Sequence, residues 1–266
     1  MKVLFVVIDG CRVDSLEREA TPTLNAIMDA GCWTLAARTV SPSITLPVHF
    51  SIFTSADPAR HGVLSNDERP RPAGDLVNLV ARLRDAGLRT AFCYNWENLR
   101  DLTAPGDLDG SLYLNTNLDR DGDERLARAA ARLLVKSGPD FAFLYLGCLD
   151  EVGHRDGYGS KPYLDSLRRA DAALGLVLRA LEDAGVRDEY ALVLQSDHGG
   201  VGLEHNAPVP EIMTVPWMAC GPGIRKAVRI ERPVSVLDTA PTICRLLGVE
   251  PPEVWEGRVV EEIFEK

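Results

Sequence analysis

The sequence predicts an α/β fold whose central sheet is mostly parallel. Short apolar segments alternate along the chain with segments of helical periodicity, which is typical of this class. Several of the apolar segments have no polar face, as expected of strands that helices cover on both sides. We predict strands at 3–8, 34–40, 90–94, 141–149, 190–195 and 216–219.

The expected helices have recognisable ends. Thr21 and Pro22 are typical of a helix start, and Gly31 follows the end of that helix. Asp75 is expected to cap a helix over 76–86. Three more helices, each with a glycine close behind it, are expected over 123–136, 163–184 and 238–247.

Length and composition indicate a single domain over residues 1–266. Hydrophobic residues make up 45% of the 266 positions, enough for a sizeable core without disulfide or metal staples. No repeat or linker divides the sequence. The stretches 56–74 and 98–122 are rich in Pro, Gly, Asp and Asn, and we predict that they form short lid loops beside a site.

Charge and cysteine usage narrow the range of partners. Lys and Arg number 29 and Asp and Glu 39, a formal net charge of −10, so we expect no nucleic-acid polymer as partner. No apolar stretch approaches the roughly 18 residues of a membrane helix, and no signal peptide is recognisable. The six cysteines lack metal-binding spacing, and we read them as reduced thiols of a cytoplasmic protein. The pattern does not indicate an oligomeric state.

Three aspartates follow predicted strands. Asp9 and Asp150 come directly after apolar segments, and Asp197 follows a third one by way of Ser196. The carboxyl ends of strands in an open α/β sheet form its ligand-binding edge, so these carboxylates are expected to converge. Each alone could be a turn or N-cap residue, but that interpretation does not explain the whole set.

Histidines accompany these aspartates. Of the five in the chain, His154, His198 and His205 lie just after Asp150 or Asp197. Aspartate and histidine together are ligands for zinc or manganese, and their charges would be costly to gather without a cation. A dinucleotide motif over 200–205 is disfavoured, because histidine stands where its third glycine should be.

A nucleophile is expected in the segment 41–51. It offers Ser41, Ser43, Thr45 and Ser51, and the residue pattern alone does not choose among them. Serine, threonine and proline clusters are also typical of loops and helix starts.

These motifs, taken in order, resemble the alkaline phosphatase superfamily, and most of all its type I phosphodiesterase/nucleotide pyrophosphatase branch. The resemblance extends from residue 2 to about residue 247 and implies an alkaline-phosphatase-like three-layer sandwich with helices on both faces of the sheet. The motifs are Ile8-Asp9-Gly10, Thr45-x-Pro-x-His49, Asp150-x-x-x-His154, Ser196-Asp197-His198-Gly199 and His205.

The resemblance implies two divalent metal ions, zinc first and manganese as the alternative. Thr45 would be the nucleophile and would leave a phosphothreonine that water hydrolyses. His49 and His61 would have supporting roles. One ion would be held by Asp9, Asp197, His198 and the oxygen of Thr45, and the other by Asp150, His154 and His205.

The sequence departs from its relatives in one place. Val48 stands where nucleotide pyrophosphatases usually carry an asparagine that contacts the phosphate. We expect Asn66 or Asn95 to supply that substrate-binding donor instead. Trp96 would either line the pocket or be an ordinary buried turn residue.

Two other branches fit less well. Sulfatases convert a Cys or Ser in a C/S-x-P-x-R pattern to formylglycine, whereas here Thr45 and His49 occupy those positions. Cofactor-independent phosphoglycerate mutases carry a large insertion for which this chain is too short.

The sequence therefore predicts a metal-dependent hydrolase of a small phosphorylated substrate, foremost a phosphodiesterase. A phosphomonoesterase or a phosphoryl-transfer mutase on the same site is the alternative. A catalytically silent domain that binds a ligand or partner is the alternative of another class.

Overall fold

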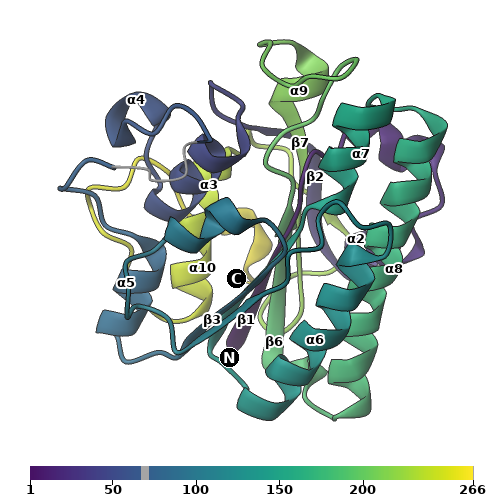
Figure 1. Ribbon diagram of the computed structural model, residues 1–266. Coiled ribbons are helices and arrows are strands. Elements are labelled where there is room, and N and C mark those ends of the chain that lie inside the picture. The colour runs from purple at the N-terminus through teal and green to yellow at the C-terminus, as the bar shows by residue number, and fades with distance from the viewer. Residues whose placement is uncertain (67–71, 266) are drawn as a thin grey trace.

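The structure, a computed structural model, describes residues 1–66 and 72–265, and in them eight strands form one sheet (Figure 1). The strand order is β4-β3-β5-β1-β6-β7-β2-β8. Only β7 runs antiparallel to its neighbours β6 and β2, so the mostly parallel sheet is confirmed. The strands are β1 (Lys2–Ile8), β2 (Gly31–Arg38), β3 (Thr90–Tyr94), β4 (Gly110–Tyr113), β5 (Phe141–Leu146), β6 (Tyr190–Gln195), β7 (Thr214–Cys220) and β8 (Val228–Arg229).

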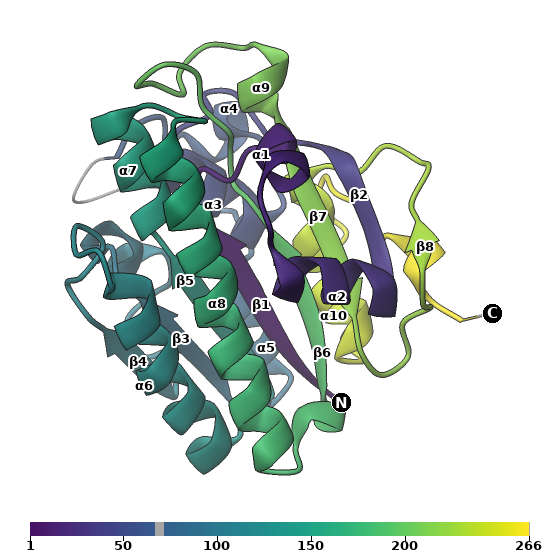
Figure 2. The ribbon, with the colours of Figure 1, turned by 90° about the vertical axis from the view of Figure 1, so that its right-hand side faces the viewer.

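Helices cover both faces of the sheet, as the resemblance implies. Alternate residues of β1 enter opposite cores: Phe5 packs in one and Val6 in the other. Figure 2 shows α2, α6 and α8 in front of the sheet, with α5 and α10 behind it. The first core is covered by α3 (Thr45–Thr54), α5 (Leu79–Asp85) and α10 (Thr239–Leu246), and the second by α2 (Pro22–Ala30), α6 (Gly122–Ser137) and α8 (Lys161–Asp183).

Short helical segments connect these layers. Most are too short to show a hydrophobic period, and the sequence analysis did not predict them. They are α1 (Val13–Arg18), α4 (Pro58–His61), α7 (Cys148–Asp156), α9 (Pro210–Met213) and the 3₁₀ turns η1 (Glu97–Asp101), η2 (Arg187–Glu189), η3 (Val236–Asp238) and η4 (Glu261–Ile263).

One predicted helix start is wrong. The helix expected over 76–86 begins at Leu79, because Asn78 and not Asp75 is its cap. The Asn78 side chain accepts a hydrogen bond from the backbone N–H of Val80 at 2.9 Å. Both residue types are good caps, so the sequence alone does not separate them.

The two expected lid loops contain regular structure. The stretch 98–122 includes β4, which pairs in parallel with β3 and forms an edge of the sheet. The stretch 56–74 includes α4, and its residues 67–71 lie outside the described part of the chain. Four residues of mixed polarity give β4 no readable pattern; its backbone pairing with β3 makes it a strand.

Two further features bear on the expectations from composition. All six cysteines lie in the described residues and are buried, free thiols. Within residues 1–66 and 72–265, no helix combines the length and the apolar character that crossing a bilayer requires.

An aromatic cluster ties α3 to the sheet and generates a stability prediction. Phe143 is fully buried, and its ring centroid lies 5.4 Å from that of Phe5, 5.1 Å from Phe53 and 5.0 Å from Phe92. Phe143→Ala is expected to lower the free energy of unfolding by about 3–5 kcal/mol, because it leaves a cavity among these rings. Urea unfolding with an unchanged m-value measures this. Leu118→Ala, at a 73% exposed position, is the control and should change stability by less than about 0.5 kcal/mol.

Candidate active site and metal centre

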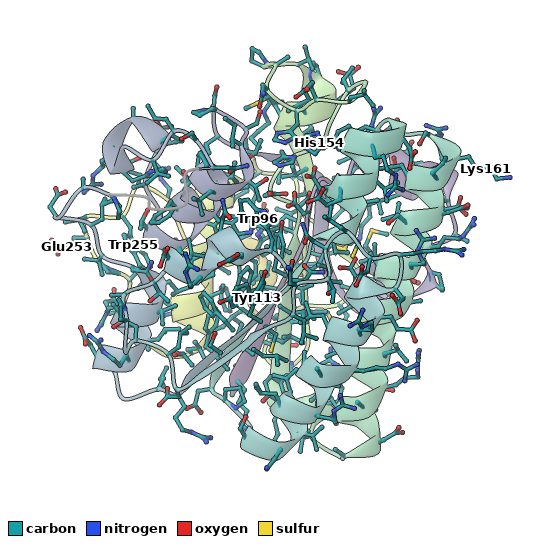
Figure 3. All side chains as sticks on the ribbon, viewed as in Figure 1. Trp96, Tyr113, His154, Lys161, Glu253 and Trp255 are labelled. Carbon is teal, nitrogen blue, oxygen red and sulfur yellow. The ribbon has the colours of Figure 1, made fainter. Side chains whose placement is uncertain are left out.

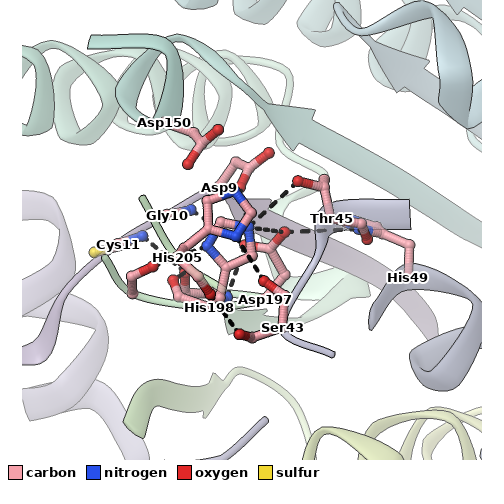
Figure 4. Close-up of polar contacts among 12 residues, drawn as sticks. Asp9, Gly10, Cys11, Ser43, Thr45, His49, Asp150, Asp197, His198 and His205 are labelled. Carbon is pink, nitrogen blue, oxygen red and sulfur yellow. Dashed lines mark hydrogen bonds and ion pairs between the residues drawn. The ribbon is translucent and has the colours of Figure 1, made fainter. Parts of the chain in front are cut away.

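Three carboxylates meet at the carboxyl edge of the sheet. Asp9 follows β1, and Asp197 lies two residues beyond the end of β6. Asp150 comes four residues after β5. Because β1 pairs in parallel with β5 on one side and with β6 on the other, these three strand ends are neighbours. Figure 4 shows the three side chains around a common centre.

The strand predicted over 141–149 is three residues too long. It ends at Leu146, and α7 begins at Cys148, so Asp150 is helical. The spacing between Asp150 and His154 therefore places them one turn apart on the same face of α7. Their Oδ2 and Nε2 atoms lie 3.3 Å apart.

Gly10 lets Asp150 approach the end of β1. Its φ is +66°, a left-handed conformation that favours glycine. A Cβ atom there would lie 2.6 Å from Oδ1 of Asp150. The backbone N–H of Gly10 also donates to Oδ1 of Asp197 at 3.1 Å. A side chain at position 10 would push the carboxylates apart.

The first cluster consists of Asp9, Asp197 and His198, all buried. Nε2 of His198 lies 3.4 Å from Oδ1 of Asp9 and 3.4 Å from Oδ2 of Asp197. The Thr45 hydroxyl is 3.3 Å from the same nitrogen. Neither of those two carboxylate oxygens has a hydrogen-bond partner among the described residues. Orphaned buried oxygens of this kind are costly unless a cation binds them.

The second cluster consists of Asp150, His154 and His205. Nε2 of His205 lies 3.1 Å from Nε2 of His154. The rings of His198 and His205 stack with centroids 3.8 Å apart, so the two clusters adjoin. Figure 3 shows His154 on α7, at the upper end of the molecule.

All three imidazoles of the two clusters are oriented in the same way. In each, Nδ1 lies at hydrogen-bond distance from a backbone carbonyl, which can only accept, so in the neutral ring Nδ1 carries the proton. Nε2 then presents a lone pair to the centre of the site. The acceptors are Gly199 O for His198 (3.0 Å), Leu203 O for His154 (2.7 Å) and Ser43 O for His205 (2.6 Å).

Two lone pairs 3.1 Å apart, on His154 and His205, repel each other unless a cation lies between them. A proton satisfies one pair, and a divalent metal ion satisfies both together with Asp150. The donor set of imidazole nitrogen and carboxylate oxygen is the one zinc prefers. On the chemistry of their donors, both clusters fit a metal ion.

The charges of the site perturb its acids and bases. Burial raises the pKa of Asp9 well above its usual value, and the charges of Asp197 and Asp150 raise it further. Burial also acts to raise the pKa of Asp150, but the hydrogen bond from His154 and the neighbouring imidazoles lower it to about 2. The same hydrogen bond raises the pKa of His154 to about 9. Without metal, Asp150 and His154 therefore form an ion pair at neutral pH.

Two tyrosines donate hydrogen bonds to the carboxylates of the site, and the sequence analysis missed both. The hydroxyl of Tyr145 donates to Oδ2 of Asp9, and that of Tyr158 donates to Oδ1 of Asp150. Each bond leaves the other oxygen of its carboxylate for the centre of the site. For Tyr145 the available signal was a tyrosine near the end of an otherwise apolar strand, since a buried hydroxyl needs a partner; Tyr158 lies in the turn after α7 and is on no strand.

Thr45 is the first residue of α3, so its hydroxyl lies at the positive end of a ten-residue helix. The other three candidate hydroxyls either form hydrogen bonds to other residues or lie outside the site. Ser43 donates to the carbonyl of His205, and Ser51 bonds Nε2 of His61. Ser41 is exposed and does not line the site cavity. The geometry therefore favours Thr45 among the four candidates.

The two remaining histidines lie behind the site. Nδ1 of His49 is 2.8 Å from the carbonyl of Thr45 and 3.8 Å from Oδ2 of Asp197. His61 bonds Ser51 and is fully buried, and burial lowers its pKa to about 4. His49, itself on α3, holds the carbonyl of Thr45, whereas His61 packs on the same helix at Phe50 and Ser51.

A small cavity of about 100 Å³ opens onto the clusters. Its volume fits a phosphate group with little else enclosed, so most of a substrate would extend outside. Trp96 forms part of its wall, at an intermediate exposure, and Figure 3 shows it near the middle of the face seen in Figure 1. The lining residues are Asp9, Thr45, Asn66, Trp96, Tyr145, Gly147, Asp150, Glu151, His154 and His205.

The two asparagines expected to bind substrate lie in different environments. Asn66 lines the cavity, and its Oδ1 accepts from the backbone N–H of Leu46 at 2.9 Å. This hydrogen bond holds the Asn66 side chain at the first turn of α3, which carries Thr45. Asn95 is fully buried and does not line the cavity: it donates to Asp123 at 2.9 Å and accepts from the N–H of Gly147 at 3.1 Å. Its amide holds the turn before α7 instead of facing a substrate.

Val48 is fully buried in the core beneath α3. A side chain at this position points away from the cavity, so its identity does not decide whether phosphate has an amide donor. Of the two asparagines expected to supply that donor, Asn66 lies on the cavity side.

A mostly parallel sheet between two helical layers, with paired Asp/His clusters at its carboxyl edge, defines a member of the alkaline phosphatase superfamily. The family model for type I phosphodiesterase/nucleotide pyrophosphatase matches residues 3–219, and the chain belongs to this family.

Individual relatives agree with this assignment. Ectonucleotide pyrophosphatase/phosphodiesterase family member 3 of Mus musculus is 26% identical over 219 residues, which are 74% of this chain and 24% of that protein. The chain thus spans about a quarter of the length of this curated relative. Human ectonucleotide pyrophosphatase/phosphodiesterase 5 has the same fold, with a TM-score of 0.85 at 16% identity and full coverage of both chains. The murine protein, as an inactive threonine-to-alanine variant in complex with AMP, matches with a TM-score of 0.82 at 17% identity, again with full coverage.

The ion pair at the second cluster generates a prediction about metal binding. Because the hydrogen bond to Asp150 raises the pKa of His154 to about 9, a metal ion must displace a proton from Nε2 at any lower pH. Zinc affinity is expected to weaken as pH falls from about 9 towards 6, with about one proton released per ion bound here near neutral pH. Calorimetric titration of zinc in buffers of different ionisation enthalpy measures the release. In His154→Gln the release should fall by that proton, and heats independent of buffer in the unsubstituted protein would contradict the prediction.

Proposed function

We propose that the chain is a phosphodiesterase that uses Thr45 as nucleophile and two zinc ions as cofactors, with manganese as the alternative metal. One observation carries the proposal. The Thr45 hydroxyl lies at a helix N-terminus, 3.3 Å from His198, beside two clusters whose oxygens and imidazole lone pairs point inwards. Family membership supports the reaction class, and the AMP complex of the murine relative supports a nucleotide phosphodiester as substrate.

Seven side chains would hold the metals, with the division that the resemblance implies. Asp9, Asp197, His198 and Thr45 Oγ1 would hold one ion, and Asp150, His154 and His205 the other. When bound, such ions lower the pKa of a coordinated hydroxyl and neutralise charge on a transferring phosphoryl group.

The residues of the chain would perform the chemistry in two displacements. In the first, Oγ1 of Thr45 forms a bond to phosphorus, the bond to the leaving alcohol oxygen breaks, and the Thr45 proton is lost to solvent or to the leaving group. In the second, water attacks the phosphothreonine from the opposite side, and Thr45 leaves with its proton restored. The first peptide units of α3 stabilise negative charge near Thr45 in both steps.

Tyr145 and Tyr158 would hold two of the carboxylates in a fixed orientation. Each hydroxyl fixes one oxygen of Asp9 or Asp150, so the second oxygen keeps its direction through the reaction. His49 would fix the carbonyl of Thr45 at the start of α3. These groups position the reacting residues without touching the substrate phosphorus.

The substrate is proposed to be small, because the cavity encloses about 100 Å³. Trp96 would offer an aromatic face beside the phosphate site. The described residues of the stretch 56–74, among them Asn66, and the stretch 98–122 would act as the short lids. A cytoplasmic location and the absence of nucleic-acid and membrane partners stay predictions.

Replacing Thr45 tests the nucleophile. Thr45→Ala is expected to lower kcat for bis-p-nitrophenyl phosphate by at least about 10³-fold, because no other hydroxyl of the segment reaches the clusters. Thr45→Ser keeps the oxygen and should retain measurable turnover. Elemental analysis should still find metal in Thr45→Ala, since six of the seven ligands remain.

The same assay decides among the alternatives. Faster hydrolysis of p-nitrophenyl phosphate than of the diester would indicate a phosphomonoesterase, and transfer of phosphate to an added alcohol in place of water would indicate a transferase. Absence of turnover with zinc and manganese, together with absence of bound metal, would contradict the two-metal site and favour a silent binding domain.

Asn66 is proposed as the amide donor to the phosphate. Asn66→Ala is expected to lower kcat/KM for bis-p-nitrophenyl phosphate by about 10- to 100-fold, because a donor to the developing charge is lost. Asn115→Ala, at an exposed position that does not line the cavity, is the matched control and should leave kcat/KM unchanged. Equal activity of the two variants would exclude the role of Asn66.

A further inference from the structure

Two more cavities open on the helical layer, beside α7 and away from the Thr45 cavity. One, of about 240 Å³, lies between α6 and α8, and the other, of about 280 Å³, lies between α7, α8 and the segment before α6. Figure 2 shows α6 and α8 side by side, with α7 above them. The walls shared by the two cavities consist of Arg120, Cys148, Ser166 and Arg169.

Arg120 and Arg169 face these cavities without a partner. Within the described parts of the chain, neither guanidinium donates a hydrogen bond to protein or forms an ion pair. Their neighbours do: Arg125 pairs with Asp119 at 2.8 Å and Arg128 with Glu124 at 2.7 Å. Both residues line both cavities. Burial lowers the pKa of Arg169 and the positive charge of Arg120 lowers it further, whereas the charges of Asp165 and Asp123 raise it.

Most carboxylates around the cavities are bonded to groups other than this pair. Five of the six are already engaged: Asp119 with Arg125, Glu124 with Arg128, Asp165 with Arg168, Asp123 with Asn95, and Glu151 with Asn117. The sixth, Asp121, lines the first cavity together with Arg179, and neither forms an ion pair among the described residues. Arg120 and Arg169 are therefore left without a direct carboxylate partner, although the lining as a whole, with five arginines and six carboxylates, has no positive excess.

Ser166 supplies a third donor. Its residue is 1% exposed, yet it lines both cavities, and its hydroxyl has no hydrogen-bond partner in the described structure. A buried hydroxyl normally finds a partner, so one is expected from outside the protein. Two guanidinium groups and a hydroxyl match the oxygens of a tetrahedral anion.

We propose that Arg120, Arg169 and Ser166 form a second anion site, which binds a phosphate group. The site is separate from the seven ligands around Thr45 but adjoins them. Glu151 lines both the larger of the two cavities and the Thr45 cavity, and α7 carries Asp150 and His154 on the side facing the clusters. The phosphate is either a second phosphate of a substrate that extends past Glu151, or free phosphate in solution.

Calorimetric titration with inorganic phosphate tests the site on the full chain, zinc-loaded and metal-free in parallel. Metal-free protein should bind one phosphate, because without metal the buried carboxylates of the Thr45 site repel a second one. Arg120→Gln/Arg169→Gln should weaken this binding at least about tenfold, because charge-assisted hydrogen bonds are lost. Arg169→Lys keeps the charge and should retain part of the affinity. Arg132→Gln, at an exposed position on α6 outside both cavities, is the matched control and should bind like the unsubstituted protein.

Thermal unfolding confirms that the variants fold. Phosphate affinity that is equal in the double variant and the control, or no binding in either the zinc-loaded or the metal-free chain, overturns the proposal. The metal-free titration needs no turnover. Its result therefore tests the anion site even if Thr45 proves not to be a nucleophile.

Kinetics separate the two sources of phosphate. If the site takes a second phosphate of the substrate, the double variant should raise KM for a dinucleoside tetraphosphate about fivefold or more and leave KM for bis-p-nitrophenyl phosphate unchanged. If it takes free phosphate, both KM values stay unchanged and only phosphate binding is lost.

Discussion

The burial of three carboxylates at adjoining strand ends is the constraint on which the rest of this structure depends. Asp9, Asp150 and Asp197 are removed from water beside one another, an arrangement that destabilises a fold unless opposite charge compensates it. One oxygen of each is satisfied by a tyrosine hydroxyl or by backbone N–H groups. Two residues maintain this geometry: Gly10, which leaves room for Asp150, and Asn95, whose side-chain amide fixes the turn before α7.

The sequence predicted the architecture and the ligand set because both rest on local patterns. Apolar segments followed closely by aspartate predicted the carboxyl ends of β1 and β6 correctly, and parallel pairing of β1 with β6 then brings these ends together. The end of β5 was misplaced because Leu149 is apolar and continues the strand pattern into α7. β4 was missed because a four-residue edge strand is made by its partner and not by its own residues.

What the sequence could not supply was the direction in which each side chain points. Asn66 and Asn95 both lie in polar segments, yet one lines the cavity and the other is enclosed by Asp123 and the turn at Gly147. Arg120 and Arg169 lie 49 positions apart, and only the packing of the helices shows that they share a wall. Such contacts arise from tertiary packing, and no period or motif encodes them.

The facing Nε2 atoms of His154 and His205 allow a bound ion to cross-link distant segments of the chain. The ring of His154 belongs to α7, whereas His205 belongs to the loop after β6 and is tethered by Nδ1 to Ser43 near the start of α3. An ion held between them would join three segments distant in sequence, much as a disulfide does. Binding of the metal would therefore limit the opening of the native loops more than it limits the unfolded chain. The rate of proteolysis within the segment 199–209 would then report directly how much of the site is occupied by metal.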